Sequence, residues 1–156
     1  DNPVIGEILD SQKLLNYIFE KEKRSKSFFT PKNMEFLKWR YINNPLQNYR
    51  AIFDKDYFIA GYLKDRGKFT EFRISEALIF GNTHKGAKAA ILKMARESGA
   101  TILSISPRSG IKFNTGITKR FGPVLTFKKI NLIDQEEQIL LDLSFWNYSL
   151  GDLELF

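Results

Sequence analysis

The chain has 156 residues, 43% of them apolar and 14 of them phenylalanine, with 24 basic and 18 acidic side chains for a net charge of +6. This length and composition predict one domain over residues 1–156 with a hydrophobic core, and they exclude a disordered chain. Because the chain has no cysteine and a single histidine, disulfides, cysteine nucleophiles, thiolate metal sites and multi-histidine metal sites are excluded.

The sequence has no apolar run long enough to span a membrane and no signal peptide pattern, so we expect a cytoplasmic protein without a membrane partner. It begins at Asp1 without Met, which predicts a segment of a longer protein, with a neighbouring domain or a second copy as a partner. Basic residues gather near the end of the first predicted helix, at Lys21, Lys23, Arg24, Lys26 and Lys32. They indicate either an anion-binding surface or a solvated helix end, and we favour the second. We therefore do not expect nucleic acid as a partner.

The first part of the chain has helical patterns. Apolar residues at helical spacing predict a helix over Ile8–Glu22, and Ser25–Thr30 is a polar connection. Thr30-Pro31 predicts the start of a second helix, because proline suits the first helical turn. Asn44-Pro45 ends that helix.

A three-stranded antiparallel meander follows. Its strands are predicted at Tyr49–Phe53, Tyr57–Lys64 and Lys68–Phe80, with turns at Asp54-Lys55-Asp56 and Asp65-Arg66-Gly67. The long third strand leads directly into the next unit.

Residues Arg73–Ser106 have the pattern of a strand, a glycine-containing turn, an amphipathic helix and a second strand. The helix presents apolar residues on one face, namely Ala87, Ala90, Ile91, Met94 and Ala95. Gly99 ends the helix, and Thr101–Ile105 resumes the strand pattern. A helix that begins in such a turn directs free backbone N–H groups and its positive dipole end at the turn, which favours phosphate. The unit therefore indicates a nucleotide- or coenzyme-binding turn.

The last part of the chain is predicted as a short helix over Phe113–Phe121, a strand over Val124–Ile130, a polar turn over Asp134–Gln138 and a strand over Ile139–Tyr148. A crossover helix joins parallel strands, whereas a meander is antiparallel. We therefore predict an α/β (α+β) fold with a mixed central sheet, an antiparallel meander followed by a β-α-β crossover, and helices on both faces.

This order of elements resembles the GNAT (N-acetyltransferase) superfamily, in which acetyl-coenzyme A lies between two splayed central strands. Tyr57–Leu63 resembles the hydrophobic family strand with an internal glycine, and Asn114–Gly122 resembles the segment that begins with Asn and ends in Gly-Phe. Phe36–Tyr41 before Asn44-Pro45 and the ending around Trp146 resemble bacterial members associated with surface polysaccharide biosynthesis and sugar modification.

The resemblance implies an acyl-CoA-dependent N-acyltransferase that acts on a small amine, such as an amino sugar, by direct transfer. Glu76 would relay a proton from the amine, and the backbone N–H of Phe80 would stabilise the oxyanion. Acetyl-CoA would be the cosubstrate, held by Phe80, Gly81, His84, Lys85, Gly86, Ala87, Lys88 and Asn114. An acceptor would lie near Arg108 and Ser109 or near Trp39, Arg40 and Tyr41.

The chain also departs from the family pattern. The pyrophosphate loop of the family reads Q/R-x-x-G-x-G/A, whereas this chain has Thr83, Gly86 and Lys88 at the three marked positions. Thr118 stands where the family has a tyrosine general acid. Glu76 has a purely structural interpretation as well, as a carboxylate of the sheet face paired with Arg73 or a nearby lysine. The alternative function is a catalytically degenerate domain of this fold that serves as a binding or structural module.

Overall fold

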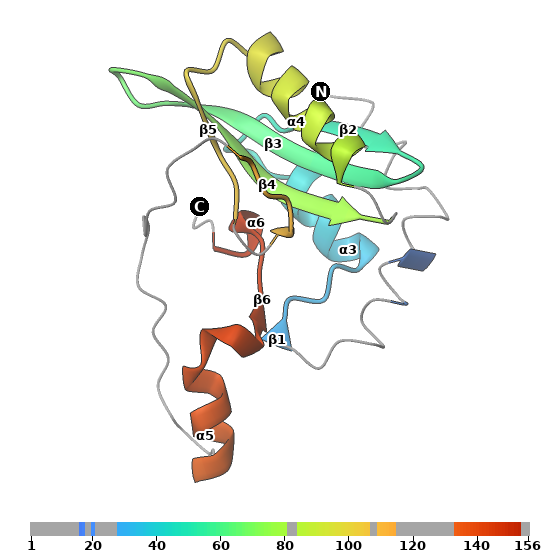
Figure 1. The fold of residues 1–156 in the computed structure, drawn as a ribbon, viewed down its shortest axis with the longest axis vertical. Coiled ribbons are helices and arrows are strands. Elements are labelled where there is room, and N and C mark those ends of the chain that lie inside the picture. The colour runs from blue at the N-terminus through green and yellow to red at the C-terminus, as the bar shows by residue number, and fades with distance from the viewer. Residues whose placement is uncertain are drawn as a thin grey trace.

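The computed structural model describes residues 16–17, 20, 28–80, 84–106, 109–114 and 133–153. Its centre is a four-stranded sheet in the order β2-β3-β4-β5 (Figure 1). The strands are β2 (Arg50–Asp54), β3 (Tyr57–Asp65), β4 (Thr70–Ile79) and β5 (Ile102–Ser104). The first three strands pair antiparallel, and β4 pairs parallel with β5 after the crossover helix α4 (Lys85–Glu97). The predicted mixed α/β (α+β) fold, with a meander followed by a crossover, is confirmed.

Helices pack on both faces of the sheet, as predicted. On one face the five predicted apolar residues of α4 are all buried, and they pack against a cluster that includes Ile59, Phe72 and Ile74. On the other face lie α3 (Met34–Leu37) and the π-helical turn η1 (Lys38–Ile42). Leu37 and Tyr41 of these helices pack against Phe58, Ala60, Tyr62 and Leu78.

Gly99 ends helix α4 in the way the sequence indicates. Its φ of +73° is a left-handed conformation that favours glycine. The Gly99 N–H donates to the Arg96 carbonyl at 3.0 Å, and the Ala100 N–H donates to the Ala95 carbonyl at 3.1 Å. These two bonds form a Schellman motif, which satisfies the last carbonyls of the helix and directs the chain into β5.

A β-bulge in β4 decides which way Glu76 points. Ala60 pairs with Glu76 and Gly61 pairs with Ile74, so Ser75 is the extra residue. Before the bulge Ile74 packs on the α4 side of the sheet, whereas after it Ala77 takes that side. The side chain of Glu76 therefore lies on the opposite face, together with Tyr41. A Cβ at Gly61 would lie 2.6 Å from the Arg73 carbonyl oxygen, so the close approach of β3 to β4 at the bulge requires glycine.

The second helix begins later than predicted, at Met34 rather than at Pro31. The Asn33 Oδ1 atom accepts a hydrogen bond from the Phe36 N–H at 2.8 Å, which places the N-cap at Asn33. The segment before it is also not wholly a loop, because Phe28–Phe29 form strand β1. Strand β1 pairs in parallel with β6 (Trp146–Asn147), an association between segments far apart in the sequence that local patterns cannot predict.

The predicted closing strand Ile139–Tyr148 and the turn before it are wrong. Helix α5 (Asp134–Leu141) covers this region, followed by the 3-10 turn η3 (Leu143–Phe145), the short β6 and helix α6 (Leu150–Leu153). Local bonds explain the break, since the Asp142 Oδ1 accepts from the Ser144 N–H at 2.8 Å and the Trp146 indole donates to the Leu140 carbonyl at 3.0 Å. Such side-chain bonds compete with an extended ladder.

Other predicted elements lie largely outside the described residues. Of Ile8–Glu22, only residues 16, 17 and 20 are described, and all are helical. The strand Val124–Ile130 and most of the short helix Phe113–Phe121 are not described. Within the part of the chain that the structure describes, no helix is long and apolar enough to cross a membrane.

Candidate functional site

Strands β4 and β5 separate soon after they meet. They pair only from Glu71 opposite Ile102 to Arg73 opposite Ser104, and β4 then continues to Ile79 paired with β3. The segment Asn147–Asp152 approaches β4 beyond this point, with α6 beneath the sheet (Figure 1). A cavity of about 80 Å³ lies here. Its walls come from Tyr17, Phe29, Thr30, Lys32, Ile74, Ser75, Glu76, Ala77, Leu78, Ile105, Ser106, Ser109, Asn147, Tyr148, Ser149, Leu150 and Asp152.

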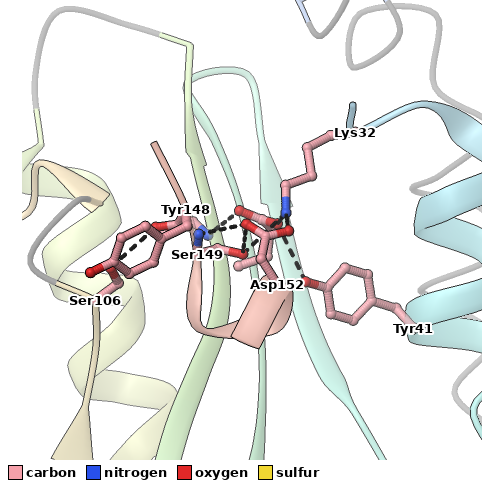
Figure 2. Close-up of polar contacts among 8 residues, drawn as sticks. Lys32, Tyr41, Ser106, Tyr148, Ser149 and Asp152 are labelled. Atoms are coloured by element: carbon pink, nitrogen blue, oxygen red, sulfur yellow. Dashed lines mark hydrogen bonds and ion pairs between the residues drawn. The ribbon is translucent and has the colours of Figure 1, made fainter. Parts of the chain in front are cut away.

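A polar cluster around the Lys32 ammonium forms one side of the cavity. Figure 2 shows the side chains of Lys32, Ser149 and Asp152 directed toward one another. The Lys32 ammonium lies 3.0 Å from Glu76 Oε2, forms an ion pair with Asp152 Oδ1 and donates to Ser149 Oγ at 3.1 Å. The three charged side chains are 13%, 4% and 5% exposed for Lys32, Glu76 and Asp152 respectively. Ion pairs this deeply buried are less screened by solvent than surface pairs. We call these four residues the Lys32 cluster.

The acceptors of the Lys32 cluster are held by bonds of their own. Asp152 Oδ2 accepts from the Ser149 N–H at 2.7 Å and from the Ser149 hydroxyl at 3.1 Å. Glu76 Oε1 accepts from the Ala77 N–H at 3.3 Å, and Glu76 Oε2 accepts from the Tyr41 hydroxyl at 3.4 Å. Burial, followed by the nearby charge of Glu76, raises the pKa of Tyr41 well above its ordinary value. The phenol therefore remains a donor at neutral pH.

Glycine at position 151 lets α6 approach the sheet closely. A Cβ there would lie 2.6 Å from the Tyr41 hydroxyl oxygen and 3.1 Å from the Ser75 carbonyl oxygen. Nearby, the Ser106 hydroxyl donates to the Tyr148 carbonyl at 3.2 Å (Figure 2). The C-terminal segment is thus fixed on both sides of the opening between β4 and β5.

The sequence predicts Arg73 or a nearby lysine as a partner for Glu76, and the structure shows a lysine. Arg73 bonds Glu71 instead, with its Nε 3.1 Å from Glu71 Oε1, and the lysine that pairs with Glu76 is Lys32. Ser109, predicted near an acceptor, lines the same cavity. Tyr41 lies behind Glu76, whereas Trp39 is 50% exposed and neither it nor the buried Arg40 lines the cavity.

The predicted phosphate-binding turn lies apart from the cavity walls. His84 is the N-cap of α4, Lys85 and Gly86 are exposed, and Ala87 is buried. The Lys88 ammonium donates to the Lys112 carbonyl at 3.2 Å and lies 5.0 Å from the centre of the Phe113 ring. The Lys88 side chain is therefore directed to the segment 111–114 rather than to the turn at the N-terminus of α4.

The other residues predicted near the coenzyme or the acceptor are either exposed or outside the described part of the chain. Asn114 is exposed, and Gly81, Thr83, Arg108 and Thr118 lie outside the described residues.

The backbone N–H of Phe80, which was expected to stabilise the oxyanion, already donates a hydrogen bond within the protein. The Phe80 N–H donates to the Asp56 carbonyl at 2.7 Å, closing the β2–β3 turn against the end of β4. The Phe80 ring packs 4.5 Å from the Tyr17 ring and 6.0 Å from that of Phe53. This geometry contradicts the expectation that the Phe80 amide is free to bind a substrate carbonyl, because a backbone N–H has one hydrogen to donate.

Sequence reasoning missed Lys32, Ser149 and Asp152 as site residues. Lys32 counts in the sequence only as one of several basic residues near a helix end, and Asp152 lies 120 positions further along the chain. The signal that could have found them is the need of a buried Glu76 for a cation, which Lys32 meets.

A second buried carboxylate on β4 has a different environment. Glu71 accepts from Arg66 Nε at 2.8 Å, from Arg73 Nε at 3.1 Å and from the Ser104 hydroxyl at 2.6 Å. Burial by itself raises the pKa of Glu71, but the hydrogen bonds from Ser104, Arg66 and Arg73 together outweigh it, and the pKa is lowered. Because Glu71 does not line the cavity, we interpret it as structural.

Among the described residues, no group of three or more His, Asp or Glu side chains is placed to hold a metal ion. Comparison of the chain with protein-family models, with curated proteins and with solved structures finds no match.

Proposed function

We propose that the chain is an acyl-CoA-dependent N-acyltransferase that transfers an acetyl group directly to a small primary amine, such as an amino sugar. The observation that carries the proposal is the placement of Glu76: a glutamate whose side chain is only 4% exposed lines a cavity at the point where two parallel strands part. A proton acceptor in a partly enclosed site beside a strand opening is what amine acylation needs.

The reaction balances with Glu76 as the proton acceptor. Glu76 takes one proton from the acceptor ammonium, and the neutral nitrogen attacks the thioester carbonyl carbon. The C–N bond forms and the C–S bond breaks, and the second proton that the nitrogen loses passes to the departing thiolate, which leaves as a thiol. Among the described residues, the exposed Lys85 and the first-turn amide of the exposed Gly86 in α4 suit the coenzyme phosphates, because such an amide has no partner within the helix.

A second candidate function is a domain of this fold that binds a partner without catalysis. Two observations favour it: the Phe80 N–H is bonded to Asp56, and Asn147–Asp152 lies against the opening between β4 and β5. In that case the Lys32 cluster serves only to hold the segment before α3 and the C-terminal segment on the sheet.

Coenzyme binding distinguishes the two functions. Acetyl-CoA should raise the melting temperature of the purified chain in a concentration-dependent manner, since a ligand of the native state stabilises it. Gly86→Asp, which places a negative charge at the N-terminus of α4, should abolish the shift. No shift at millimolar acetyl-CoA would contradict the acyltransferase and favour the binding module.

Catalysis is tested with Glu76→Gln. Thiol release from acetyl-CoA is followed over a panel of small amines and amino sugars. Glu76→Gln should retain the acetyl-CoA shift and lose turnover by roughly 10²–10⁴-fold, the usual contribution of a general base. Glu97→Gln is the matched control, because the Glu97 side chain is 59% exposed and does not line the cavity, and it should leave the rate unchanged. An unchanged rate in Glu76→Gln would exclude Glu76 as the base.

A further inference from the structure

The oxygens around the Lys32 ammonium form a complete acceptor set. A lysine ammonium has three N–H donors. Glu76 Oε2, Asp152 Oδ1 and Ser149 Oγ surround Lys32 Nζ as its acceptors. Two of these oxygens belong to carboxylates, which make the strongest hydrogen bonds to ammonium groups.

These oxygens are positioned independently of Lys32. Ser149 holds Asp152 through its backbone N–H and its hydroxyl, while Tyr41 and the Ala77 N–H hold Glu76. The glycine at 151 allows α6 to bring this arrangement against Tyr41. Replacement of the lysine should therefore leave the acceptor oxygens close to their present places.

Lys32 itself is the replaceable member of the cluster. It extends from the irregular segment before α3, and its Nζ lies 4.9 Å from the centre of the Phe36 ring. Its acceptors, in contrast, come from β4 and from the chain around α6. Among the residues that line the cavity, Lys32 is the cation and Glu76 and Asp152 are the anions. The buried Arg40 affects Tyr41 electrostatically but does not line the cavity.

The cavity limits the size of a ligand. At about 30 Å³ per water molecule, a volume of about 80 Å³ corresponds to roughly 3 water molecules, which fits an ammonium group with a short carbon chain. A larger acceptor would place only its amine end here.

We propose that Glu76, Ser149 and Asp152 form a binding site for a primary ammonium group, which Lys32 occupies in the free protein and which an acceptor amine takes by displacing Lys32. The role of the ligand as acceptor rests on the proposed function, whereas the binding site does not. Displacement would place the acceptor nitrogen directly beside Glu76, the proposed proton acceptor. Lys32 would then act as an internal competitor, and a ligand must bind these oxygens more favourably than the tethered Lys32 ammonium does in order to displace it.

The test uses the full chain with Lys32→Met, which keeps an unbranched side chain and removes the ammonium. Ethylammonium chloride is titrated while the melting temperature and the heat of binding are measured. Saturable binding should be at least 10-fold tighter in Lys32→Met than in the parent chain, because the internal competitor is gone. Adding Asp152→Asn to Lys32→Met should weaken binding at least 10-fold.

Matched controls separate a built site from a general effect of charge. Lys93→Met removes an exposed lysine, with 69% of its side chain accessible, and should behave like the parent chain. Potassium chloride and tetramethylammonium, which has no N–H donor, should not replace ethylammonium. Equal stabilisation by either salt, or no tighter binding in Lys32→Met than in Lys93→Met, would overturn the proposal.

Two further outcomes are informative. If Lys32→Met does not fold alone, it is refolded in ethylammonium chloride and, separately, in potassium chloride. Recovery of folded protein only in ethylammonium chloride supports the site. Equal failure in both salts overturns it. Because no coenzyme is present in these experiments, binding of ethylammonium without any acetyl-CoA shift would contradict the acyltransferase and leave the ammonium site standing. A rise in melting temperature with acetyl-CoA but no binding of ethylammonium would support the acyltransferase and contradict the ammonium site.

Discussion

At the scale of single residues, β4 holds two buried glutamates with opposite character. Glu71 accepts hydrogen bonds from two arginines and a serine, so its carboxylate is fully used by the fold. Glu76 faces a cavity and an ammonium that comes from a loop. The same residue type on the same strand is therefore structural in one place and a candidate for chemistry in the other.

Glu71 should contribute stability that depends on pH. Because the folded-state pKa lies below the ordinary value of 4.5, the contribution is present above that pH and is lost as the pH falls through the folded-state pKa. Glu71→Gln should lower the free energy of unfolding by about 1–3 kcal/mol at pH 7, the cost of losing hydrogen bonds to a charged group. Urea denaturation from pH 7 to pH 3 should show the gap between parent and variant narrowing below about pH 4.5. A gap that stays constant to pH 3 would contradict this account.

Gly151 offers a second prediction at this scale. Gly151→Ala would place a methyl group 2.6 Å from the Tyr41 hydroxyl oxygen, so either α6 or the buried Tyr41 side chain must shift. We expect a loss of about 1–3 kcal/mol, typical of overpacking, measured by urea denaturation. In Gly151→Ala combined with Tyr41→Phe the loss should shrink, since the clashing oxygen is gone. An equal loss in both backgrounds would show that Tyr41 is not the obstacle.

At the scale of elements, the strand-helix-strand unit is built from local signals. Helix α4 has its apolar face, its glycine stop and the following strand where the pattern indicates. The bulge at Ser75 is the exception, because it changes the side on which later residues of β4 point. Without it, strict alternation would direct Glu76 toward α4, on the same side as Ile74.

Gly99→Ala tests the helix stop. The left-handed φ of +73° disfavours alanine, so we expect a loss of about 1–2 kcal/mol in thermal or urea unfolding. Gly99→Asn is the matched control and should lose less, because asparagine tolerates this conformation better. If alanine were as stable as asparagine, backbone conformation would not be the reason for glycine here.

At the scale of the whole molecule, the sheet separates two apolar clusters. Ile91 of α4 belongs to one and Phe58 of β3 to the other, and both are fully buried. The Lys32 cluster then joins the segment before α3, the centre of the sheet and the C-terminal segment. Stability should accordingly depend on both faces of the sheet.

Substitutions on the two faces should be nearly additive. Ile91→Val should cost about 0.5–1.5 kcal/mol and Phe58→Leu about 1–3 kcal/mol, from lost burial and residual cavity volume. Because the residues share no cluster, the double variant should equal the sum of the single variants within about 0.5 kcal/mol in urea denaturation. A larger coupling energy would mean that the sheet transmits packing changes from one face to the other.

The sequence by itself determined the meander, the crossover helix and its glycine stop, since these follow from periodicity and turn chemistry between neighbouring residues. It also indicated Glu76. Only the tertiary structure decided the rest of the site: Lys32 and Asp152 meet across 120 positions, and the bulge at Ser75 turns Glu76 toward them. The structure also showed the Phe80 N–H bonded to Asp56. The physical reason is that a buried ion pair depends on which distant segments pack together, whereas a helix or hairpin depends mainly on spacing along the chain.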